Sequence, residues 1–275
     1  MNEKLKILHI ADSREEGGRS SYTVDLVKAL NLEGCENFLL TSEKSEIKTL
    51  SKHRSVAMKV VNKITTNKIL NFANETGAGI LHFHDSDVYD YLPSRKDAKR
   101  NSVKTIVDLH RYDWRKKHFP FQRTLLKADL LIASTIKERN FTHDIPFPVE
   151  RVVIVHKPVN ALRFNQTISP RPILAAFNVP PEIMLIGTVT RLDDTMNYRL
   201  WADTIELIVG KYADIEFLVV GEGERKTGFQ NLLKNRGLDN KVMFTGFRKD
   251  IPQIIAAMDI YFHPTFEDLV HYSVL

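Results

Sequence analysis

The sequence predicts an α/β fold with two domains, each built around a doubly wound parallel sheet. Three observations support this expectation. Short β-branched and leucine-rich runs alternate with amphipathic helical segments, and such alternation is typical of parallel sheets with helical crossovers. The alternation lapses once, in a polar stretch rich in proline, and then starts again. The length of 275 residues is also enough for two domains.

The first domain is expected to cover residues 1–165. Its first helix has the clearest pattern, because apolar side chains recur at helical spacing from Tyr22 through Val27 to Leu30. The other segments follow from β-branched runs and from the same helical spacing. The expected strands are 4–11, 37–40, 80–83, 105–109, 129–133 and 152–155, and the expected helices are 20–32, 58–74 and 88–100.

Residues 166–181 are expected to form a linker, since several prolines interrupt a short polar stretch there. The second domain then covers residues 182–275. Its expected strands are 183–189, 215–220, 242–244 and 260–262, and its expected helices are 198–212, 225–236 and 251–258. Because the alternation stops after these segments, we expect the second sheet to be incomplete.

The composition is that of an ordinary globular protein and excludes several classes. The longest apolar runs are strand-sized, whereas a transmembrane helix needs roughly 20 apolar residues. The N-terminus lacks the small-residue cleavage site of a signal peptide, so we expect a cytoplasmic protein. A lone cysteine, Cys35, excludes an intramolecular disulfide and a multi-cysteine metal site. The net charge of +5 allows a polyanionic partner, but the basic residues are scattered and solvated surface is the favoured interpretation.

Two glycines, Gly17 and Gly18, lie between the first expected strand and the first expected helix. Glycine lets the backbone approach a ligand closely. Ser20 or Ser21 can cap the following helix, whose N-terminal amides favour an anion. The spacing differs from the GxGxxG pattern of dinucleotide-binding proteins, so an ordinary turn between strand and helix is an equally good interpretation.

Three histidines lie at strand ends. His82 and His84 are expected on one face of a strand, because side chains alternate between faces. A zinc site would need a third ligand, and none is evident nearby in the sequence. A buried structural role is therefore favoured for both. His110 follows its strand in a polar, aromatic loop and is the best candidate for polar contact with a substrate.

Three successive strand ends of the second domain carry groups that suit a phosphate. They are Arg191, the glycine turn at Gly221, and Arg248 preceded by Phe247. The carboxyl ends of parallel strands lie at one edge of the sheet, where ligands bind. A guanidinium stays charged and forms two-pronged hydrogen bonds to phosphate. The sequence therefore predicts a diphosphate site at this edge.

The order of these motifs resembles the retaining glycosyltransferases of family 4, or glycosyltransferase group 1, whose two facing Rossmann-like domains form the GT-B fold. The resemblance covers essentially the whole chain. The motifs are, in order, residues 17–18, 82–85, 110, 128–134, 153–160, 187–192, 220–223, 242–248 and 257–264. The resemblance implies a hexosyltransferase-type enzyme of polysaccharide biosynthesis, which transfers a sugar from a nucleotide-sugar donor with retention. It also implies that no cofactor and no metal take part.

The resemblance further assigns the donor site to the second domain. Phe247 and Arg248 are then expected near the base and Arg191 on the diphosphate, with Gly221 in the same site. The loop of Gly17 and Gly18 is expected to reach the phosphates from the first domain. Stabilising the negative charge of the leaving diphosphate would be the main catalytic task.

The resemblance places the catalytic candidates at His110, near the transferred sugar, and at Asp268, which matches the first glutamate of the family's motif. Glu267 beside it serves with a shift of one residue. His84 and Asp85 are expected on the acceptor side. The acceptor is expected to be a glycan or a lipid-linked glycan, so a basic first domain can contact the inner face of a membrane peripherally.

The chain departs from the family at three points. Met196 stands where the family has a lysine, and losing that cation should cost on the order of 2–4 kcal/mol of transition-state stabilisation. Leu269 and His271 replace glycines near the acidic motif. The second glutamate of the motif would come at or after Leu275, so the chain is expected to be truncated, and impaired or inactive.

Two alternatives stay open from the sequence. One is a nucleotide-sugar epimerase with the same two-domain architecture. The other is a non-catalytic or degenerate relative that acts as a scaffold, which Met196 and the expected truncation would favour. Nucleic acid is not expected as a partner, because only residues 111–118 approach a basic stripe with aromatic side chains.

Overall fold

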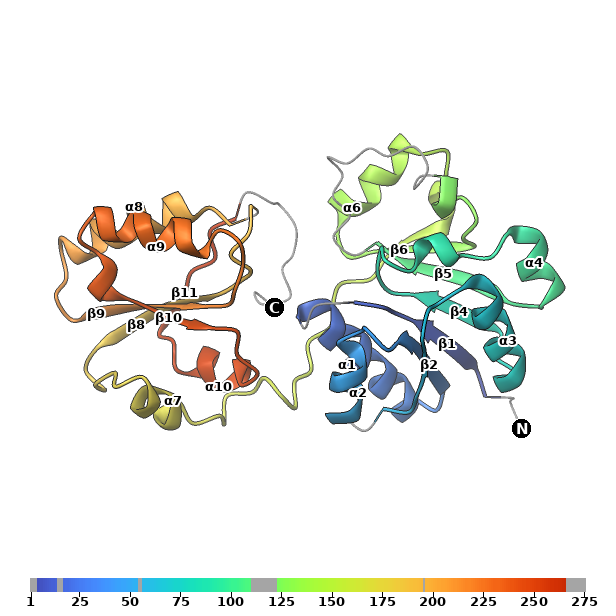
Figure 1. The fold of residues 1–275 in the computed structure, drawn as a ribbon, viewed down its shortest axis with the longest axis horizontal. Helices are drawn as coiled ribbons and strands as arrows, with labels where there is room; N and C mark the ends of the chain where they lie inside the picture. The colour runs from blue at the N-terminus through green and yellow to red at the C-terminus, as the bar shows by residue number, and fades with distance from the viewer. Residues whose placement is uncertain (1–3, 14–16, 54–55, 110–122, 195, 266–275) are drawn as a thin grey trace. The chain divides into compact units, whose positions relative to one another are not determined.

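The computed structural model describes residues 4–13, 17–53, 56–109, 123–194 and 196–265 (Figure 1). Contacts divide the chain into two compact units, the first ending at Val159 and the second beginning at Asn160. Each unit is an α/β structure around a parallel sheet. The prediction of two doubly wound parallel-sheet domains is confirmed.

The first unit contains a seven-stranded sheet with the order β3-β2-β1-β4-β5-β6-β7, in which neighbouring strands are parallel. The strand order changes direction between β1 and β4, and this is the point where doubly wound sheets bind ligands. The strands are β1 (Lys6–Ile10), β2 (Glu36–Ser42), β3 (Met58–Val61), β4 (Ile80–Phe83), β5 (Lys104–Asp108), β6 (Leu130–Ala133) and β7 (Val152–Ile154). The α-helices described are α1 (Gly18–Leu32), α2 (Ile47–His53), α3 (Thr66–Thr76), α4 (Arg95–Arg100) and α6 (Ile136–Phe141).

Helices cover both faces of the first sheet because its strands are apolar on both sides. Val27 of α1 and Ile47 of α2 pack with Leu39 in one buried cluster. Ile69 of α3 and Leu81 of β4 belong to a second and larger cluster.

The second unit contains a smaller sheet of four parallel strands among the described residues, with the order β10-β9-β8-β11. Its strand order changes direction between β8 and β11. The strands are β8 (Met184–Val189), β9 (Ile215–Val220), β10 (Val242–Gly246) and β11 (Ile260–Tyr261). The helices are α7 (Arg171–Ala176), α8 (Tyr198–Val209), α9 (Lys226–Asn235) and α10 (Ile251–Ala256).

In Figure 1, α8 and α9 lie on one face of this sheet, and α7 and α10 lie on the other. The alternation of β9 explains the arrangement. Phe217 packs with Trp201 of α8 and Phe229 of α9, whereas Leu218 packs on the other side with Ile173 of α7. Successive side chains of a strand point to opposite faces, so one strand supplies both cores.

Two expected helices of the first unit are wrong in part. The expected helix 58–74 divides into the strand β3 and the helix α3. β-branched Val60 and Val61 favour a strand, and the Thr65 side chain caps α3 by accepting a hydrogen bond from the Lys68 amide. The expected helix 88–100 is a 3-10 turn, Tyr89–Tyr91, followed by α4. Pro93 lies between them, and the Ser94 side chain caps α4.

Three short helices, α2, α6 and α7, were not expected. α7 lies inside residues 166–181, the segment expected to be a linker. Pro172 stands in its first turn, where a missing amide hydrogen costs little, and Ile173 is buried in the second unit's core. Pro170 and Pro172 therefore stand at the start of a helix that packs on the second unit.

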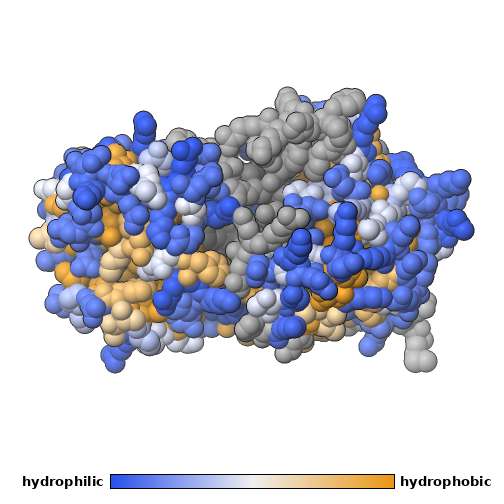
Figure 2. Space-filling model, in the orientation of Figure 1, coloured by the Kyte–Doolittle hydropathy of each residue, from blue (hydrophilic) through white to orange (hydrophobic). Residues whose placement is uncertain are grey.

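Charged and polar side chains cover most of the face drawn in Figure 2, with apolar side chains between them. The longest described helix, α1, has 15 residues. Within the described residues, none of the helices combines the length and the apolar character that crossing a bilayer requires.

Candidate functional site

The carboxyl edge of the second sheet brings together the loops that the sequence analysis selects as the donor site. Backbone hydrogen bonds join the loops after β8, β9 and β10. Thr190 N donates to Val220 O over 2.9 Å, and Gly221 N donates to Gly246 O over 2.9 Å. The loops with Arg191, with Gly221 and with Phe247 and Arg248 are therefore neighbours, as parallel strands require.

Two glycines permit this close packing of loops. Gly221 has a φ of +135°, and a Cβ on it would lie 1.8 Å from the Thr190 carbonyl oxygen. A Cβ on Gly223 would lie 2.2 Å from the Leu192 carbonyl oxygen. Side chains at these positions would separate the loops, so the glycines hold the edge in its present shape.

The two arginines of this edge differ in how they are held. Arg191 is half exposed, and its Nε lies 3.3 Å from Asp193 Oδ2. Arg248 donates two hydrogen bonds to Asp250, over 2.8 and 2.6 Å, and its guanidinium lies 5.6 Å from the ring centre of Phe177. The hydrogen bond to Asp250 raises the pKa of Arg248 and lowers the pKa of Asp250. Phe247 beside it is 47% exposed and can stack on a planar ligand.

Met196 occupies the position at which the resemblance implies a lysine. Its side chain lies in the core of the second unit. It is 2% exposed and packs in the cluster that contains Trp201. Its backbone forms an isolated antiparallel bridge with Thr265. Position 196 therefore supplies packing, and the chain has no cation there.

His263 lies where the second sheet changes direction and was not singled out as a site residue. Its Nδ1 lies 3.5 Å from Thr188 Oγ1, and its ring stacks with that of Tyr261 at 6.1 Å. Tyr261 in turn donates a hydrogen bond to the Val189 carbonyl over 3.0 Å. Burial lowers the pKa of His263. The sequence does contain a signal for this site residue, because His263 directly follows a short expected strand and precedes Pro264.

We expect His263 to make the stability of the second unit depend on pH. Its pKa is lower in the native state than the value of about 6.5 in an unfolded chain. The unfolded state therefore takes up a proton first, and the stability contributed by neutral His263 is complete above about pH 6.5 and is lost as the pH falls through the native pKa. Urea unfolding at pH 8 and at pH 5.5 gives the free energy of unfolding at each pH. The decrease between pH 8 and pH 5.5 should be smaller for His263→Gln than for the wild type. His143→Gln, at an exposed histidine, is the control. An equal decrease in the wild type, His263→Gln and His143→Gln would contradict the prediction.

The glycine loop of the first unit lies at the start of α1. Gly17 is the N-cap residue, with an extended φ of 176°, and its carbonyl accepts from Ser21 N over 3.0 Å. Gly18 is the first residue of the helix, so the expectation that Ser20 or Ser21 caps it is wrong. Gly17 has no side chain that could cap the helix, and the first amides of a helix favour an anion.

His84 and Asp85, the expected acceptor-side residues, are buried. His84 is 1% exposed, and Asp85 is 2% exposed. Asp85 Oδ2 accepts a hydrogen bond from the Asp12 amide over 3.0 Å, which joins the ends of β4 and β1. His84 Nδ1 lies 2.8 Å from Asp108 Oδ2. The structural role favoured for the histidine pair from the sequence agrees with this burial.

Sequence reasoning missed two partners of these histidines. His9 of β1 lies 2.8 Å from His84, measured between Nδ1 and Nε2, and Asp108 ends β5 beside both histidines of β4. Only the order of strands in the sheet brings these segments together, so local spacing could not find them. The catalytic candidates His110, Glu267 and Asp268 lie outside the described residues.

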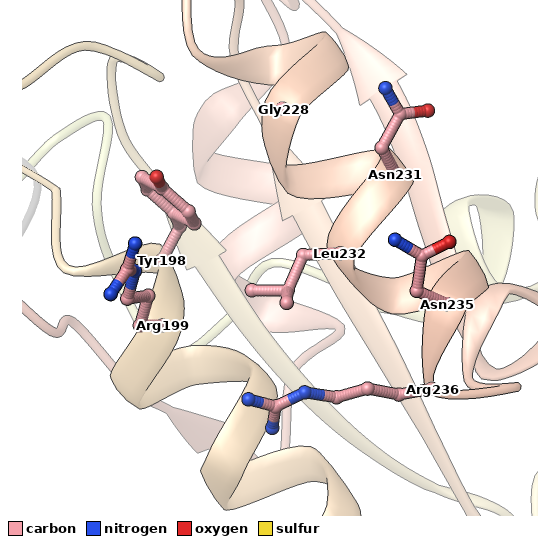
Figure 3. A pocket seen from close by; sticks show the side chains of 7 residues that line it. All are labelled: Tyr198, Arg199, Gly228, Asn231, Leu232, Asn235 and Arg236. Carbon is pink, nitrogen blue, oxygen red and sulfur yellow. The ribbon is translucent and has the colours of Figure 1, made fainter.

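A hollow of about 410 Å³ lies on the surface of α8 and α9 (Figure 3). Tyr198, Arg199 and Arg236 line it, together with two asparagines of α9. Arg236 is held there by Asp203 and Glu206, at 2.6 and 2.9 Å. Because two carboxylates already balance the charge of Arg236, this hollow is a weak anion site.

Comparison with known proteins shows where the similarity lies. A model of the family Glycosyl transferases group 1 matches residues 181–275, so the resemblance to group 1 is confirmed for that segment. A curated relative, the 2-deoxystreptamine glucosyltransferase of Streptomyces kanamyceticus, is 27% identical over 86 residues. That alignment spans 30% of this chain and only 22% of the relative's length.

Solved structures share the fold of the whole described chain. HepE of Anabaena in complex with UDP-glucose matches with a TM-score of 0.79 at 18% identity, covering 95% of this chain and 74% of HepE. A glycosyltransferase from Rickettsia africae matches with a TM-score of 0.78 at 17% identity, covering 96% of this chain and 74% of that one. At such identities the likeness shows the fold, two Rossmann-like units of the GT-B type.

Proposed function

We propose that the chain is a glycosyltransferase that transfers a sugar from a nucleotide-sugar donor to an acceptor hydroxyl. The observation that carries the proposal is the carboxyl edge of the second sheet, where two arginines and two tightly packed glycine turns lie on adjacent loops. The group 1 match of residues 181–275 covers all of these loops. HepE, which shares the fold, was solved with UDP-glucose bound, and this supports a nucleoside diphosphate as the ligand.

In the proposed reaction, the bond between the anomeric carbon and the diphosphate oxygen breaks. A bond from the same carbon to the acceptor oxygen forms on the same face of the sugar, and the nucleoside diphosphate leaves with the acceptor's proton. Negative charge grows on the diphosphate as it leaves. Arg191 is placed to stabilise that charge, because its guanidinium is half exposed and its contact with Asp193, at 3.3 Å, is longer than the two hydrogen bonds between Arg248 and Asp250. A guanidinium also stays charged at any physiological pH.

Arg248 has a different role in the proposal. Asp250 already accepts two hydrogen bonds from its guanidinium, so Arg248 is better suited to orient a ligand than to hold a diphosphate. Exposed Phe247 beside it offers a flat apolar surface for the base. This division of roles agrees with the resemblance, which places Phe247 and Arg248 near the base and Arg191 on the diphosphate.

We also propose that turnover is slow. The resemblance leads to a second cation at position 196, and the buried Met196 cannot supply it. The acceptor in the proposal is a glycan or a lipid-linked glycan bound by the first unit, and a peripheral membrane contact would fit a chain of net charge +5. The proposed slow release of nucleoside diphosphate can be measured directly with UDP-glucose, with and without simple glucoside acceptors.

The test is calorimetric titration with UDP, GDP and ADP of the wild type and of three arginine variants. Losing a charge-assisted hydrogen bond costs about 1.5–3 kcal/mol, so Arg191→Gln should weaken binding of the preferred nucleotide roughly 10- to 100-fold. Arg248→Gln should weaken it less. Arg236→Gln is the matched control, because Arg236 lines the hollow on α8 and α9.

Two outcomes would contradict the proposal. One is that none of the three nucleotides binds to the folded protein. The other is that Arg236→Gln weakens binding while Arg191→Gln has no effect, which would move the anion site to the helical surface. A nucleotide-sugar epimerase would instead bind the donor and change its sugar without releasing nucleoside diphosphate, and a scaffold would do neither.

A further inference from the structure

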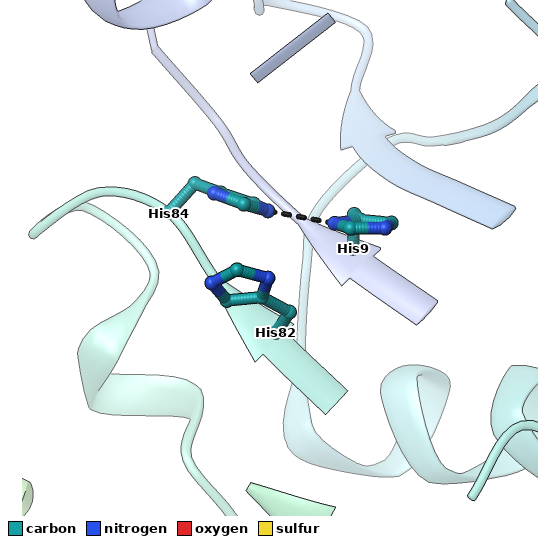
Figure 4. Close-up of side chains that lie close together, drawn as sticks. All are labelled: His9, His82 and His84. Carbon is teal, nitrogen blue, oxygen red and sulfur yellow. Dashed lines mark hydrogen bonds between the residues drawn. The ribbon is translucent and has the colours of Figure 1, made fainter. Parts of the chain in front are cut away.

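Three histidine rings meet inside the first unit, at the point where its sheet changes direction (Figure 4). His9 comes from β1, and His82 and His84 come from the end of β4. One nitrogen from each ring lies within 4.8 Å of the others, and all three residues are buried. The rings face α1, where Tyr22 lies with its ring centre 6.3 Å from that of His84.

The hydrogen bonds of His9 fix which of its nitrogens carries the hydrogen. Asn37 donates through Nδ2 to Asn31 over 3.0 Å, so its carbonyl oxygen faces His9 Nε2 at 2.9 Å. A carbonyl only accepts, and therefore Nε2 carries the hydrogen. With its hydrogen on Nε2, a neutral His9 has its lone pair on Nδ1.

The same reasoning shows which nitrogen of His84 carries the hydrogen. Its Nδ1 lies 2.8 Å from Asp108 Oδ2, and a carboxylate only accepts. Nδ1 therefore carries the hydrogen, and a neutral His84 has its lone pair on Nε2. That nitrogen lies 2.8 Å from His9 Nδ1. Two lone pairs at this distance repel each other, so a cation between them is required, either a proton or a metal ion.

His82 decides which cation fits better. Its Nε2 is buried and lies 3.1 Å from Asp108 Oδ1, without the alignment of a hydrogen bond. A proton between His9 and His84 would use two nitrogens and leave this third ring out. A metal ion would use all three, with the Asp108 carboxylate close enough to offset part of its charge.

We propose that His9, His82 and His84 form a binding site for a divalent transition-metal ion of the Zn²⁺ class. Neutral imidazole is a preferred ligand for such ions. Metal-binding histidines characteristically donate their other ring hydrogen to a carboxylate or carbonyl, and Asp108 and Asn37 already hold His84 and His9 in this way. Zn²⁺ binds nitrogen at about 2.0–2.1 Å in a tetrahedron, so the two facing nitrogens would move apart to roughly 3.3 Å.

The proposal does not depend on the proposed glycosyl transfer. The resemblance implies transfer without a metal at the diphosphate, and the histidine site lies in the other unit. Metal uptake and nucleotide binding can therefore succeed or fail separately. The site would hold the ends of β1, β4 and β5 together at the ligand edge of the first sheet.

The test is metal binding by the full chain after treatment with a chelator. We expect one equivalent of Zn²⁺ to bind tightly in competition calorimetry, and Co²⁺ to give the strong visible absorption of a tetrahedral nitrogen site. His82→Asn should weaken binding at least 10-fold, and Asn37→Ala about 10-fold through loss of the bond that orients His9. His143→Asn, on the exposed surface of the same unit, should bind like the wild type.

Equal Zn²⁺ affinity in the wild type and in His82→Asn would overturn the proposal, because the metal would then bind elsewhere. An octahedral Co²⁺ spectrum, or no metal uptake by the wild type, would also overturn it. In that case His9 and His84 would share a proton. The Co²⁺ spectrum needs only the wild type, so it decides the question even if a histidine variant fails to fold.

Discussion

Replacing Gly221 by alanine should lower the free energy of unfolding of the second unit by about 3 kcal/mol or more. A residue with a side chain rarely adopts the φ of +135° found there, and the new Cβ would lie 1.8 Å from the Thr190 carbonyl oxygen. The contact is with backbone, so no side-chain rotation relieves it. Moving the loops apart would break the bonds from Gly221 N to Gly246 O and from Thr190 N to Val220 O.

The control for this prediction is Gly228→Ala in the same unit. Gly228 lies in α9, and a Cβ on it meets no atom within 4 Å. Alanine there should stabilise the helix by roughly 0.5–1 kcal/mol. Urea unfolding followed by far-UV circular dichroism gives both values, and hydrogen exchange assigns the loss at Gly221 to the loops after β8, β9 and β10. Equal stability of the two variants would show that the loops can rearrange without cost.

The second-unit edge was predictable from the sequence because its geometry follows from a local rule. Each of Arg191, Gly221 and Arg248 follows an apolar strand run, and the ends of parallel strands share an edge. The same rule did not reveal that Asp250 holds Arg248, or that Met196 is buried. The pairing of Arg248 with Asp250 and the burial of Met196 depend on the conformation of the loops, which residue spacing does not determine.

The histidine cluster shows a different limit. His9 lies within an apolar run and reads as part of an ordinary buried strand, while Asn37 begins the next one. Their contact with His84 exists because β1 lies between β2 and β4 in the sheet. The spacing in the sequence, 75 residues between His9 and His84, gives no sign of it. A strand order predicted from the sequence, with β1 next to β4, would have placed His9 beside His84.

Two predictions about helices failed because tertiary contacts overrode the local sequence pattern. Residues 58–74 have enough apolar side chains for a helix, but the pairing of Val60 with Thr41 on β2 takes the first part into the sheet. In the same way, the proline-rich segment before β8 supplies α7 because Ile173 can be buried against Leu218. Tertiary burial decided both cases against the local pattern.

Asp108 contacts two of the three clustered histidines, and its loss should destabilise the first unit strongly. Its carboxylate lies 2.8 Å from His84 Nδ1 and 3.1 Å from His82 Nε2, and it is 1% exposed. Removing one partner of a buried ionic group leaves the other groups without compensation, at a cost of about 3–5 kcal/mol. We therefore expect Asp108→Ala to destabilise the first unit by that amount, measured in chelator so that bound metal adds nothing.

Asp108→Asn separates charge from hydrogen bonding at the same position. An amide oxygen can still accept from His84, and the amide nitrogen can donate to His82, so we expect Asn to restore at least half of the stability lost with Ala. Glu75→Ala is the surface control, since Glu75 pairs with Lys59 at 2.5 Å on an exposed face and its loss should cost less than about 1 kcal/mol. If Asp108→Ala were no less stable than Glu75→Ala, the cluster would not be held by this carboxylate. In that case His9 and His84 would have to share a charge that a group other than Asp108 balances, and the hydrogen assignment behind the metal site would fail with it.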